Sequence, residues 1–220
     1  MRALVLGVSG GIGGALVQAL RGRGAEVIGL SRRDQGLDLT DQASVARIAE
    51  TLEGSFDLIF NATGALQIGA DRPEKSLNAI DAQAMAAQFA LNATGVALAL
   101  RYFTPLLHRS GRSVFASLSA RVGSIGDNRL GGWISYRAAK AAQNQIIRTA
   151  AIEIARKRPE AIVVALHPGT VASDLSAPYA ATHPRIPAQQ SAQALLAVID
   201  RLTPAETGSF WDWKGQRVEW

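Results

Sequence analysis

Short apolar runs alternate with longer amphipathic segments along the chain. The apolar runs predict strands, which we place at residues 3–6, 26–30, 57–60, 112–117 and 161–166. Apolar residues at helical spacing predict helices at residues 12–23, 44–52, 82–107, 135–157 and 188–202. Strands that alternate with helices of about ten or more residues are typical of right-handed βαβ units. The pattern therefore predicts an α/β fold: a three-layer, doubly wound parallel sheet, with residues 1–220 as a single domain.

Some segments depart from this alternation. The gap between residues 30 and 37 is too short for a parallel crossover, which needs about a dozen residues. We therefore expect the helix between the second and third strands of the usual sheet to be short or missing, and residues 37–39 to form a vestigial edge strand or only a loop. Residues 209–220 predict a hairpin around Lys214-Gly215. The irregular segments at 66–76, 123–132 and 173–187 are the expected walls of a substrate site.

Composition narrows the class of protein. Of 220 residues, 48% are apolar and 19% are charged, which is typical of a globular chain. Cysteine is absent, so a disulfide scaffold, a cysteine nucleophile and a thiolate metal site are excluded. The 3 histidines lie far apart without zinc-type spacing, so no metal is expected. Glycines interrupt the first apolar run too soon for a signal peptide, and no run of about 18 apolar residues occurs, which favours a soluble cytoplasmic protein.

The chain carries a formal net charge of +5, which raises nucleic acid as a partner. Most basic residues are single arginines, and the densest runs are Arg32-Arg33 and Arg156-Lys157-Arg158. Neither run is a basic patch of about 5–8 residues, and no aromatic stacking motif is interleaved. We interpret the charge as a mild steering field for anionic small molecules, and we expect neither a nucleic acid nor a membrane as partner. Nucleic-acid binding, which rests on charge alone, is a weaker alternative.

A glycine-rich turn follows the first strand, and a helix follows the turn at once. Gly7, Gly11 and Gly13 have the spacing G-x-x-x-G-x-G. Glycine tolerates the positive φ of a tight turn and lets backbone N–H groups reach a phosphate, while the helix N-terminus adds a positive dipole end. No Gly-Lys-Ser/Thr follows, which excludes a P-loop, and the position in the first βαβ unit favours a dinucleotide site over a merely structural turn. The candidate contacts are Gly7, Ser9, Gly10, Gly11, Ile12 and Gly13.

The end of the second strand distinguishes NAD from NADP. An NAD site would place an acidic side chain there for the ribose 2′-hydroxyl, but this chain has Ser31, Arg32 and Arg33. Arginine suits a 2′-phosphate by its charge and its bidentate geometry. A solvated pair of surface arginines is the alternative. We therefore expect these three residues to contact NADP(H), with NAD(H) as the less favoured cofactor.

Tyr136 and Lys140 lie near the start of a predicted helix. A spacing of four places both side chains on one face, one turn apart. A free tyrosine has a pKa near ~10, which is too high for a base at neutral pH, and a nearby ammonium favours the phenolate. The pair is therefore a candidate acid/base group for a substrate oxygen. Taken alone, such a pair is weak evidence and is better explained by an exposed helix face.

These motifs stand in the order found in the short-chain dehydrogenase/reductase family, which the chain resembles over nearly its whole length. The further matches are Asp38-Leu39, Asn61-Ala62-Thr63-Gly64, Asn92 in Asn-Ala-Thr-Gly, and His167-Pro168-Gly169-Thr170-Val171. Each match is common by chance, but the whole series in order is not. Residues 121–128, 131–133 and 210–215 are similar to the branch that contains C-factor-like and sniffer-like carbonyl reductases. The resemblance implies a Rossmann-like fold.

The resemblance also implies hydride transfer between NADP(H) and a carbonyl or secondary alcohol. Tyr136 would exchange a proton with the substrate oxygen, Lys140 would hold the nicotinamide ribose and lower the pKa of Tyr136, and Asn92 would support a water-linked proton relay. The implied cofactor contacts, besides Tyr136 and Lys140, are Asp38 and Leu39 at the adenine, Asn61, Ala62 and Thr63 at its ribose, and Gly169, Thr170, Val171 and Ser173 at the nicotinamide. The alternative is a dinucleotide-binding signalling or sensor protein of the C-factor type, with little or no turnover.

The serine that binds the carbonyl departs from its usual place in the family. It normally stands three residues before a glycine, but the residue three places before Gly123 is Ala120. We expect Ser119, one place earlier, to take this role, with Ser117 or Ser124 as alternatives. A strand-end serine bonded to the backbone is the structural explanation of the same residue.

Other candidate side chains are better explained by structure. His167 is expected to be a packed or hydrogen-bonded histidine rather than a base. Trp211, Trp213 and Trp220 are expected to cover the core or a subunit surface. Family members are often dimers or tetramers, and the Ala-rich helices of this chain are compatible with a homo-oligomer.

Overall fold

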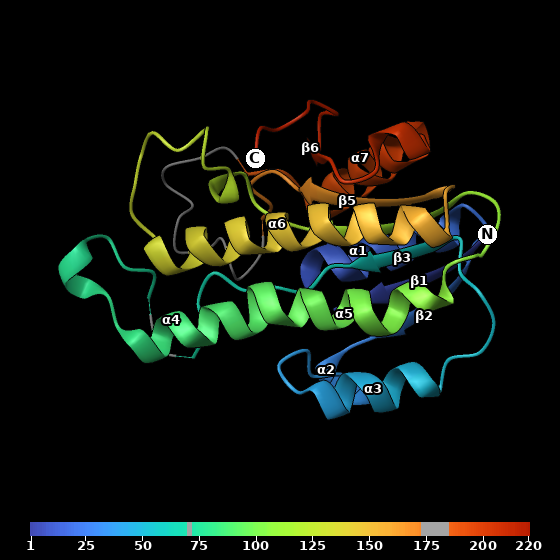
Figure 1. Cartoon of the computed structure of the whole chain (residues 1–220), viewed down its shortest axis with the longest axis horizontal. Helices are drawn as coiled ribbons and strands as arrows, with labels where there is room; N and C mark the ends of the chain where they lie inside the picture. Colours follow the sequence, from blue (N-terminus) through green and yellow to red (C-terminus); the bar gives the residue numbers. More distant parts are fainter. Residues whose placement is uncertain (70–71, 173–184) are drawn as a thin grey trace.

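The computed structural model describes residues 1–69, 72–172 and 185–220. Its strands are β1 (Arg2–Leu6), β2 (Glu26–Leu30), β3 (Leu58–Asn61), β4 (Ser113–Leu118), β5 (Ala161–His167) and β6 (Phe210–Asp212). They form one parallel sheet in the order β2-β1-β3-β4-β5-β6 (Figure 1). The chain adds β2 on one side of β1 and then crosses to β3 on the other side, so the switch point lies between β1 and β3. The predicted doubly wound fold is confirmed.

Helices cover both faces of the sheet (Figure 1). α1 (Gly11–Gly22) and α7 (Ala188–Arg201) pack on one face, and α3 (Gln42–Glu50), α5 (Gly95–Phe103) and α6 (Ile134–Lys157) pack on the other. In β1, Leu4 and Leu6 face the α5 layer, while Ala3 and Val5 face the α1 layer. A strand buried on both faces explains why the strands appeared as continuous apolar runs. None of the helices in the described ranges is long and apolar enough to cross a membrane.

The segment after β2 is a loop rather than a strand. α2 (Arg32–Gln35) is a single helical turn that ends at Gly36, whose φ of 72° is left-handed. Leu37 and Leu39 are buried in the core on the α5 side, and residues 37–39 form no strand. The expectation of a short helix here is therefore confirmed, and of the two alternatives for residues 37–39 the loop is correct.

The helix expected at residues 82–107 is interrupted. α4 (Ala82–Phe89) passes into a π-helical turn at Ala90–Thr94, which is followed by α5 and by a 3-10 turn at Thr104–Leu106. A π turn takes one extra residue into the helix and is frequent at functional sites. In this chain it contains Asn92, one of the predicted catalytic residues.

The C-terminal tail forms the predicted hairpin and adds a strand to the sheet. β6 pairs in parallel with β5, in a register that sets Asp212 beside His167. The chain then turns at Lys214-Gly215, and the backbone N–H of Val218 donates to the carbonyl of Phe210 at 2.8 Å. The tail therefore reaches the carboxyl end of β5.

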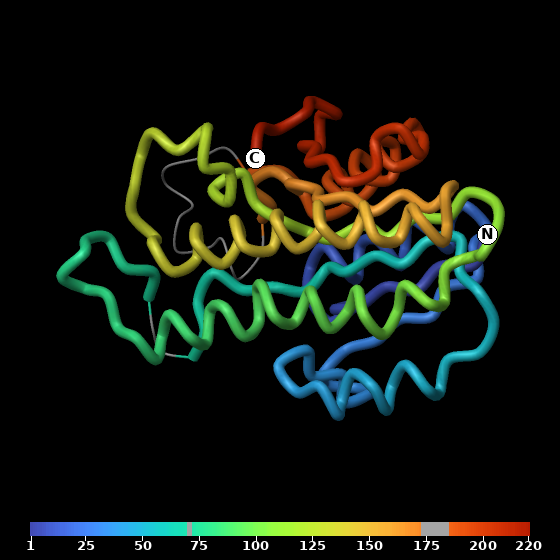
Figure 2. The backbone as a smooth tube through the Cα atoms, viewed as in Figure 1, coloured from blue at the N-terminus to red at the C-terminus, as the bar shows by residue number. Residues whose placement is uncertain are grey.

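The loops that follow β3 and β4 gather at one end of the molecule, together with the first turn of α6 (Figure 2). The N-terminus lies at the opposite end. Parallel strands terminate at the end where these loops lie, and α/β proteins bind their ligands there. The candidate residues on these loops are thus brought to one side of the sheet.

Candidate active site

The turn between β1 and α1 is shaped for close backbone contacts. Gly7 has a φ of 88°, which glycine adopts without strain. A Cβ atom at Gly13 would clash with the carbonyl oxygen of Gly7, so only a glycine lets the start of α1 pack this closely against the turn. Ser9, Gly10 and Gly11 are exposed, and Ile12 is half-buried. Within the described part of the chain no side chain caps the start of α1, so its first N–H groups fit a phosphate.

Arg32 and Arg33, which are predicted to contact a 2′-phosphate, lie beside this turn. The N–H of Gly7 donates to the carbonyl of Leu30 at 2.7 Å, which holds the glycine turn against the end of β2, where α2 begins. Arg32 and Arg33 are exposed on α2. Ser31 is buried, and its hydroxyl accepts a hydrogen bond of 3.0 Å from the backbone of α2, so this side chain caps the helical turn.

Asp38 and Leu39 have different surroundings. Asp38 Oδ1 accepts hydrogen bonds from the hydroxyl and the backbone N–H of Thr40, at 2.7 and 2.9 Å. These bonds, together with the charge of Arg32, hold the pKa of Asp38 below its usual value. Leu39 is buried, and a Cβ atom at Gly95 would lie 3.0 Å from its Cβ. The ionised Asp38 therefore lies near α2, while the side chain of Leu39 belongs to the core.

The segment after β3 adjoins the glycine turn. Asn61 Oδ1 accepts hydrogen bonds from the N–H and the hydroxyl of Thr63, at 3.2 and 2.6 Å. A Cβ atom at Gly7 would lie 3.0 Å from Cγ2 of Thr63 and 3.1 Å from the carbonyl carbon of Ala62. The predicted ribose contacts thus lie directly against the predicted phosphate turn.

Gly64 brings two predicted catalytic residues together. Its φ is 135°, and a Cβ atom there would lie 2.9 Å from Oδ1 of Asn92 and 3.1 Å from Nζ of Lys140. Asn92 is fixed by Ala65, because its Nδ2 donates to the Ala65 carbonyl at 2.9 Å and its Oδ1 accepts from the Ala65 N–H at 3.1 Å. Asn92 and Lys140 therefore both pack closely against Gly64, and these contacts depend on its lack of a side chain.

Tyr136 and Lys140 occupy successive turns of α6, as their spacing predicts. Lys140 Nζ lies 5.8 Å from the centroid of the Tyr136 ring. The amine donates to the carbonyl of Leu118 at 3.2 Å and to Oε1 of Gln143 at 2.8 Å. Lys140 is buried, and it is held by β4 and by its own helix one turn from the phenol.

Burial controls the titration of both groups. It raises the pKa of Tyr136 above its usual value and lowers the pKa of Lys140 to about 7. The expectation that Lys140 lowers the pKa of Tyr136 stays a prediction, because burial is the cause of both shifts in this structure. Tyr136 is protonated at neutral pH, and transfer of its proton requires that the phenolate be stabilised.

The three candidate serines all take part in internal hydrogen bonds. Ser119 is buried, and its hydroxyl donates to Oδ1 of Asn144 at 2.7 Å. The hydroxyl of Ser117 accepts from two side-chain amides, at 3.1 and 3.2 Å. The hydroxyl of Ser124 accepts from the N–H of Asp127 at 3.1 Å. The choice of Ser119 as the group that binds a carbonyl stays a prediction.

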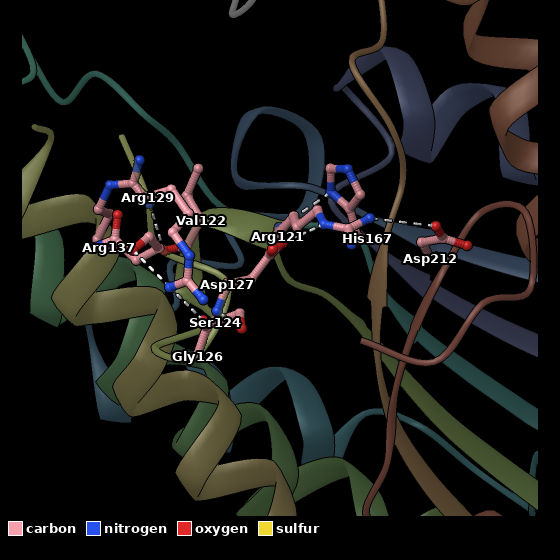
Figure 3. A network of polar contacts seen from close by, with 10 residues as sticks. Arg121, Val122, Ser124, Gly126, Asp127, Arg129, Arg137, His167 and Asp212 are labelled. Atoms are coloured by element: carbon pink, nitrogen blue, oxygen red, sulfur yellow. Dashed lines mark hydrogen bonds and ion pairs between the residues drawn. The ribbon is translucent and has the colours of Figure 1, made fainter. Parts of the chain in front are cut away.

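Arginines fix the loop after β4 against α6 (Figure 3). Arg137 on α6 donates to the carbonyl oxygens of Gly132 and Val122, at 2.9 and 3.3 Å. Arg121 forms an ion pair with Asp127 at 2.5 Å within the loop. These contacts hold the loop beside the first turn of α6, which carries Tyr136.

His167 has the structural role expected of it. Its Nδ1 accepts a hydrogen bond of 3.3 Å from the backbone N–H of Arg121 (Figure 3). Burial lowers the pKa of His167 to about 4, although Asp212 acts in the opposite direction. The imidazole is therefore neutral at neutral pH and serves as an acceptor that holds the loop after β4.

The predicted nicotinamide contacts follow β5. Gly169 has a φ of 79°, and a Cβ atom there would lie 2.7 Å from the indole nitrogen of Trp213. Val171 is buried in a parallel bridge with residue 186, and the carbonyl of Thr170 accepts a hydrogen bond of 2.9 Å from that residue. Ser173 lies outside the described residues.

Two side chains at this site were not found by sequence analysis. Gln143 contacts the amine of Lys140, and Glu74 contacts the backbone of Ser135 at the start of α6. A polar residue one turn after Lys140 is a local signal that could have identified Gln143. Glu74 gives no such signal, because its partner is distant along the chain.

Comparisons with known proteins found relatives that match most of the chain. A model of the short chain dehydrogenase family matches residues 35–184, more than half of the chain. The 1-hydroxy-2-glutathionyl-2-methyl-3-butene dehydrogenase of Rhodococcus sp. (strain AD45) is 29% identical over 99% of this chain and 98% of its own. The C-signal protein of Myxococcus xanthus is 33% identical over 76% of this chain and 94% of its own.

Solved structures share the fold over the full length. A Burkholderia multivorans protein with bound NADP, described as a short-chain dehydrogenase/reductase, gives a TM-score of 0.85 at 25% identity and covers 100% of this chain and 99% of that one. The carbonyl reductase Sniffer of D. melanogaster gives a TM-score of 0.81 at 19% identity, with coverage of 100% and 99%. The match to C-signal agrees with the branch that the sequence motifs predict, and Sniffer shares the fold. The chain belongs to the short-chain dehydrogenase/reductase family of oxidoreductases.

Proposed function

We propose that this chain is an NADP(H)-dependent oxidoreductase that interconverts a carbonyl group and a secondary alcohol, with Tyr136 as the acid/base group. The observation that carries the proposal is the convergence at Gly64. Nζ of Lys140 and Oδ1 of Asn92 lie 3.1 and 2.9 Å from the position that a Cβ atom would take there, one helical turn from Tyr136. Burial of a lysine costs folding free energy, so a buried lysine beside Asn92 and Tyr136 favours a role in binding.

Residues of the first βαβ unit would hold the dinucleotide. The N–H groups at the start of α1 suit its diphosphate, and the exposed Arg32 and Arg33 suit a 2′-phosphate. The Burkholderia multivorans relative with bound NADP supports this choice of cofactor. When bound, the cofactor supplies the hydride that the carbonyl carbon receives.

Tyr136 would supply the proton in the reduction direction. The raised pKa keeps the phenol protonated at neutral pH but also makes it a weak acid, so the phenolate has to be stabilised when the proton passes to the carbonyl oxygen. The product is an alcohol. The phenolate that remains regains a proton from water. Lys140, whose amine lies 5.8 Å from the ring, stabilises the phenolate when it carries its own proton.

Turnover of a carbonyl panel tests the proposal. The purified chain is mixed with aldehydes and ketones of different size, with NADPH or NADH, and both cofactor consumption and the alcohol product are measured. We expect reduction of at least one carbonyl class, with NADPH preferred. Binding of NADPH without reduction of any carbonyl in the panel would overturn the proposed activity.

A second candidate function is a dinucleotide-binding signalling protein with little turnover. Two observations favour it: Ala120 stands where the family has its serine, and the hydroxyl of Ser119 already bonds Asn144. The 33% identity to the C-signal protein of Myxococcus xanthus points the same way. The carbonyl panel separates the two functions, because a signalling protein of this kind would bind NADPH and reduce nothing.

A further inference from the structure

Gln143 is a polar residue in a place that favours apolar ones. It lies on α6, one turn after Lys140, and its exposed fraction is 0%. The same face of α6 contributes Ala139 and Ile147 to the buried interior. Burial of an amide costs free energy unless each of its polar atoms finds a partner, so its contacts have to be accounted for.

The contacts of Gln143 determine which way its amide points. Oε1 accepts from Nζ of Lys140 at 2.8 Å, while Nε2 donates to the carbonyl of Leu118 at 2.9 Å and to the hydroxyl of Ser117 at 3.2 Å. The opposite orientation would set an NH₂ group against the lysine amine and an acceptor against a carbonyl. Only the observed orientation satisfies both ends of the amide.

A chain of hydrogen bonds continues from Gln143 through the sheet. The hydroxyl of Ser117 on β4 also accepts from Nδ2 of Asn61 on β3, at 3.1 Å. Oδ1 of Asn61 in turn accepts from the hydroxyl of Thr63 at 2.6 Å. The position of Gln143 is thus fixed by the segment that adjoins the glycine turn.

A protonated lysine has three N–H bonds to donate. Among the described residues, Leu118 and Gln143 receive two of them. Nζ also lies 3.1 Å from the position that a Cβ atom would take at Gly64, so the amine approaches this segment closely only because the residue is glycine. The third N–H bond therefore remains for a further acceptor.

We propose that Gln143 is a positioning residue, which holds the Lys140 amine beside Gly64 and leaves its remaining N–H bond for a ligand. This inference rests on the proposed function, in which Lys140 acts beside Tyr136 at the cofactor site. Among the residues that the structure describes, the groups nearest the amine besides Gln143 are neutral: the carbonyl of Leu118 from β4 and, also against Gly64, the amide of Asn92 from the π turn. The titratable neighbour within these described residues is Tyr136 on the same helix.

Titration of Lys140 tests the inference without any need for turnover. The protein is prepared with isotope-labelled lysine, and the pKa of Lys140 is followed by NMR in the wild type, in Gln143→Leu and in Gln143→Glu. Loss of the amide acceptor should lower the pKa of Lys140, and a carboxylate at the same place should raise it. Opposite shifts are the result expected of a residue that holds the amine, and an unchanged pKa in both variants overturns the inference.

Activity and a matched control complete the experiment. Gln143→Leu should lower the kcat of carbonyl reduction by about tenfold, because a charge-assisted hydrogen bond is lost, and leave the KM for the carbonyl nearly unchanged. The control is Thr104→Val, which removes another buried hydrogen bond, from Oγ1 to the carbonyl of Leu100 at 2.7 Å, far from the site. This control should change neither the pKa of Lys140 nor kcat. If Gln143→Leu does not fold, the nearly isosteric Gln143→Glu carries the test.

The two proposals fail in different ways. A wild-type protein that reduces no carbonyl, but whose Lys140 pKa moves in opposite directions in the two variants, contradicts the proposed function and supports the role of Gln143. A wild-type protein that reduces carbonyls, with the pKa of Lys140 and kcat unaffected by both variants, overturns the role of Gln143 alone.

Discussion

Oε1 of Glu74 accepts a hydrogen bond from the backbone N–H of Ser135 at 2.7 Å, and the hydroxyl of Ser135 donates to the same oxygen. The carboxylate belongs to the loop after β3, yet it caps the start of α6. Trp133, just before α6, has a left-handed φ of 52° and donates its N–H to the carbonyl of Glu74 at 2.6 Å. Glu74 therefore fixes the helical turn that carries Tyr136.

Replacing Glu74 by Gln should destabilise the protein by about 1 kcal/mol at neutral pH, as loss of a helix cap does. Burial alone would raise the pKa of Glu74, but hydrogen bonds from the side chain and backbone of Ser135 outweigh it and hold the pKa below its usual value. A lowered folded-state pKa stabilises the protein above the unfolded pKa, and this stability is lost as pH falls through the folded pKa. Urea denaturation should therefore show the difference between wild type and Glu74→Gln shrinking toward acidic pH.

A cap on another helix provides the control. Oδ1 of Asp41 accepts from the N–H of Ala43 at 2.9 Å and caps α3. Asp41→Ala removes this cap, so it should reduce stability by about 1 kcal/mol without lowering the kcat of carbonyl reduction, whereas Glu74→Gln should lower both. Equal kcat values in the two variants would show that Glu74 only stabilises the fold.

Tyr136→Phe should reduce carbonyl turnover by about a hundredfold or more, because it removes the acid/base oxygen and keeps the ring. The Kd for NADPH should stay within a few-fold of wild type, since the glycine turn and the arginines lie elsewhere. Steady-state kinetics and a fluorescence titration measure the two quantities. A kcat near that of the wild type would refute the assignment of Tyr136.

Periodicity in the sequence was sufficient to predict most of the fold. β1, β3, β4 and β5 are almost wholly buried, so they appear as mainly apolar runs, and the long α6 shows helical spacing. The π turn around Asn92 was not predictable, because one extra residue in a helix barely changes the apolar pattern over residues 82–107. The sequence did not distinguish a loop from an edge strand at residues 37–39, because a Leu-Asp-Leu segment with two buried leucines fits both equally well.

The candidate site could be predicted only where its residues stand in local motifs. Tyr136 and Lys140 are one turn apart, so their proximity follows from helix geometry. Glu74 and Ser135 meet only through the tertiary fold, and no local pattern marks such a pair. The pKa of Lys140 also depends on tertiary structure, because burial by β4 and its neighbours lowers this pKa below its usual value.

His167 should make stability depend on pH in mildly acidic solution. Burial lowers its pKa to about 4, whereas the unfolded value is near ~6.5. Between these values the unfolded state binds a proton that the folded state does not, so stability falls as pH drops through this window. His167→Asn keeps an acceptor for the N–H of Arg121 but does not titrate. Urea denaturation should show a weaker pH slope for this variant, and an identical slope would contradict the assignment.

Arg32→Asp should weaken NADPH binding at least about tenfold more than NADH binding, because the new carboxylate repels a 2′-phosphate. Arg156→Asp is the matched control, since it makes the same change in net charge at an exposed position near the end of α6. Fluorescence titration with each cofactor gives the four Kd values. Equal losses for NADPH and NADH in Arg32→Asp would show that this arginine does not contact the 2′-phosphate.

Serine substitutions test whether a hydroxyl binds the substrate carbonyl, which is the feature that separates the proposed enzyme from the alternative signalling protein. If Ser119 binds the carbonyl oxygen, Ser119→Ala should lower kcat by about a hundredfold, as loss of an oxyanion donor does. Ser124→Ala should have little effect, because the Ser124 hydroxyl accepts from the backbone of its own loop. Ala120→Ser restores a hydroxyl at the third place before Gly123, where the family has its serine. A kcat that is unchanged in Ser119→Ala but raised in Ala120→Ser would mean that the native chain lacks this donor, which would favour the signalling function.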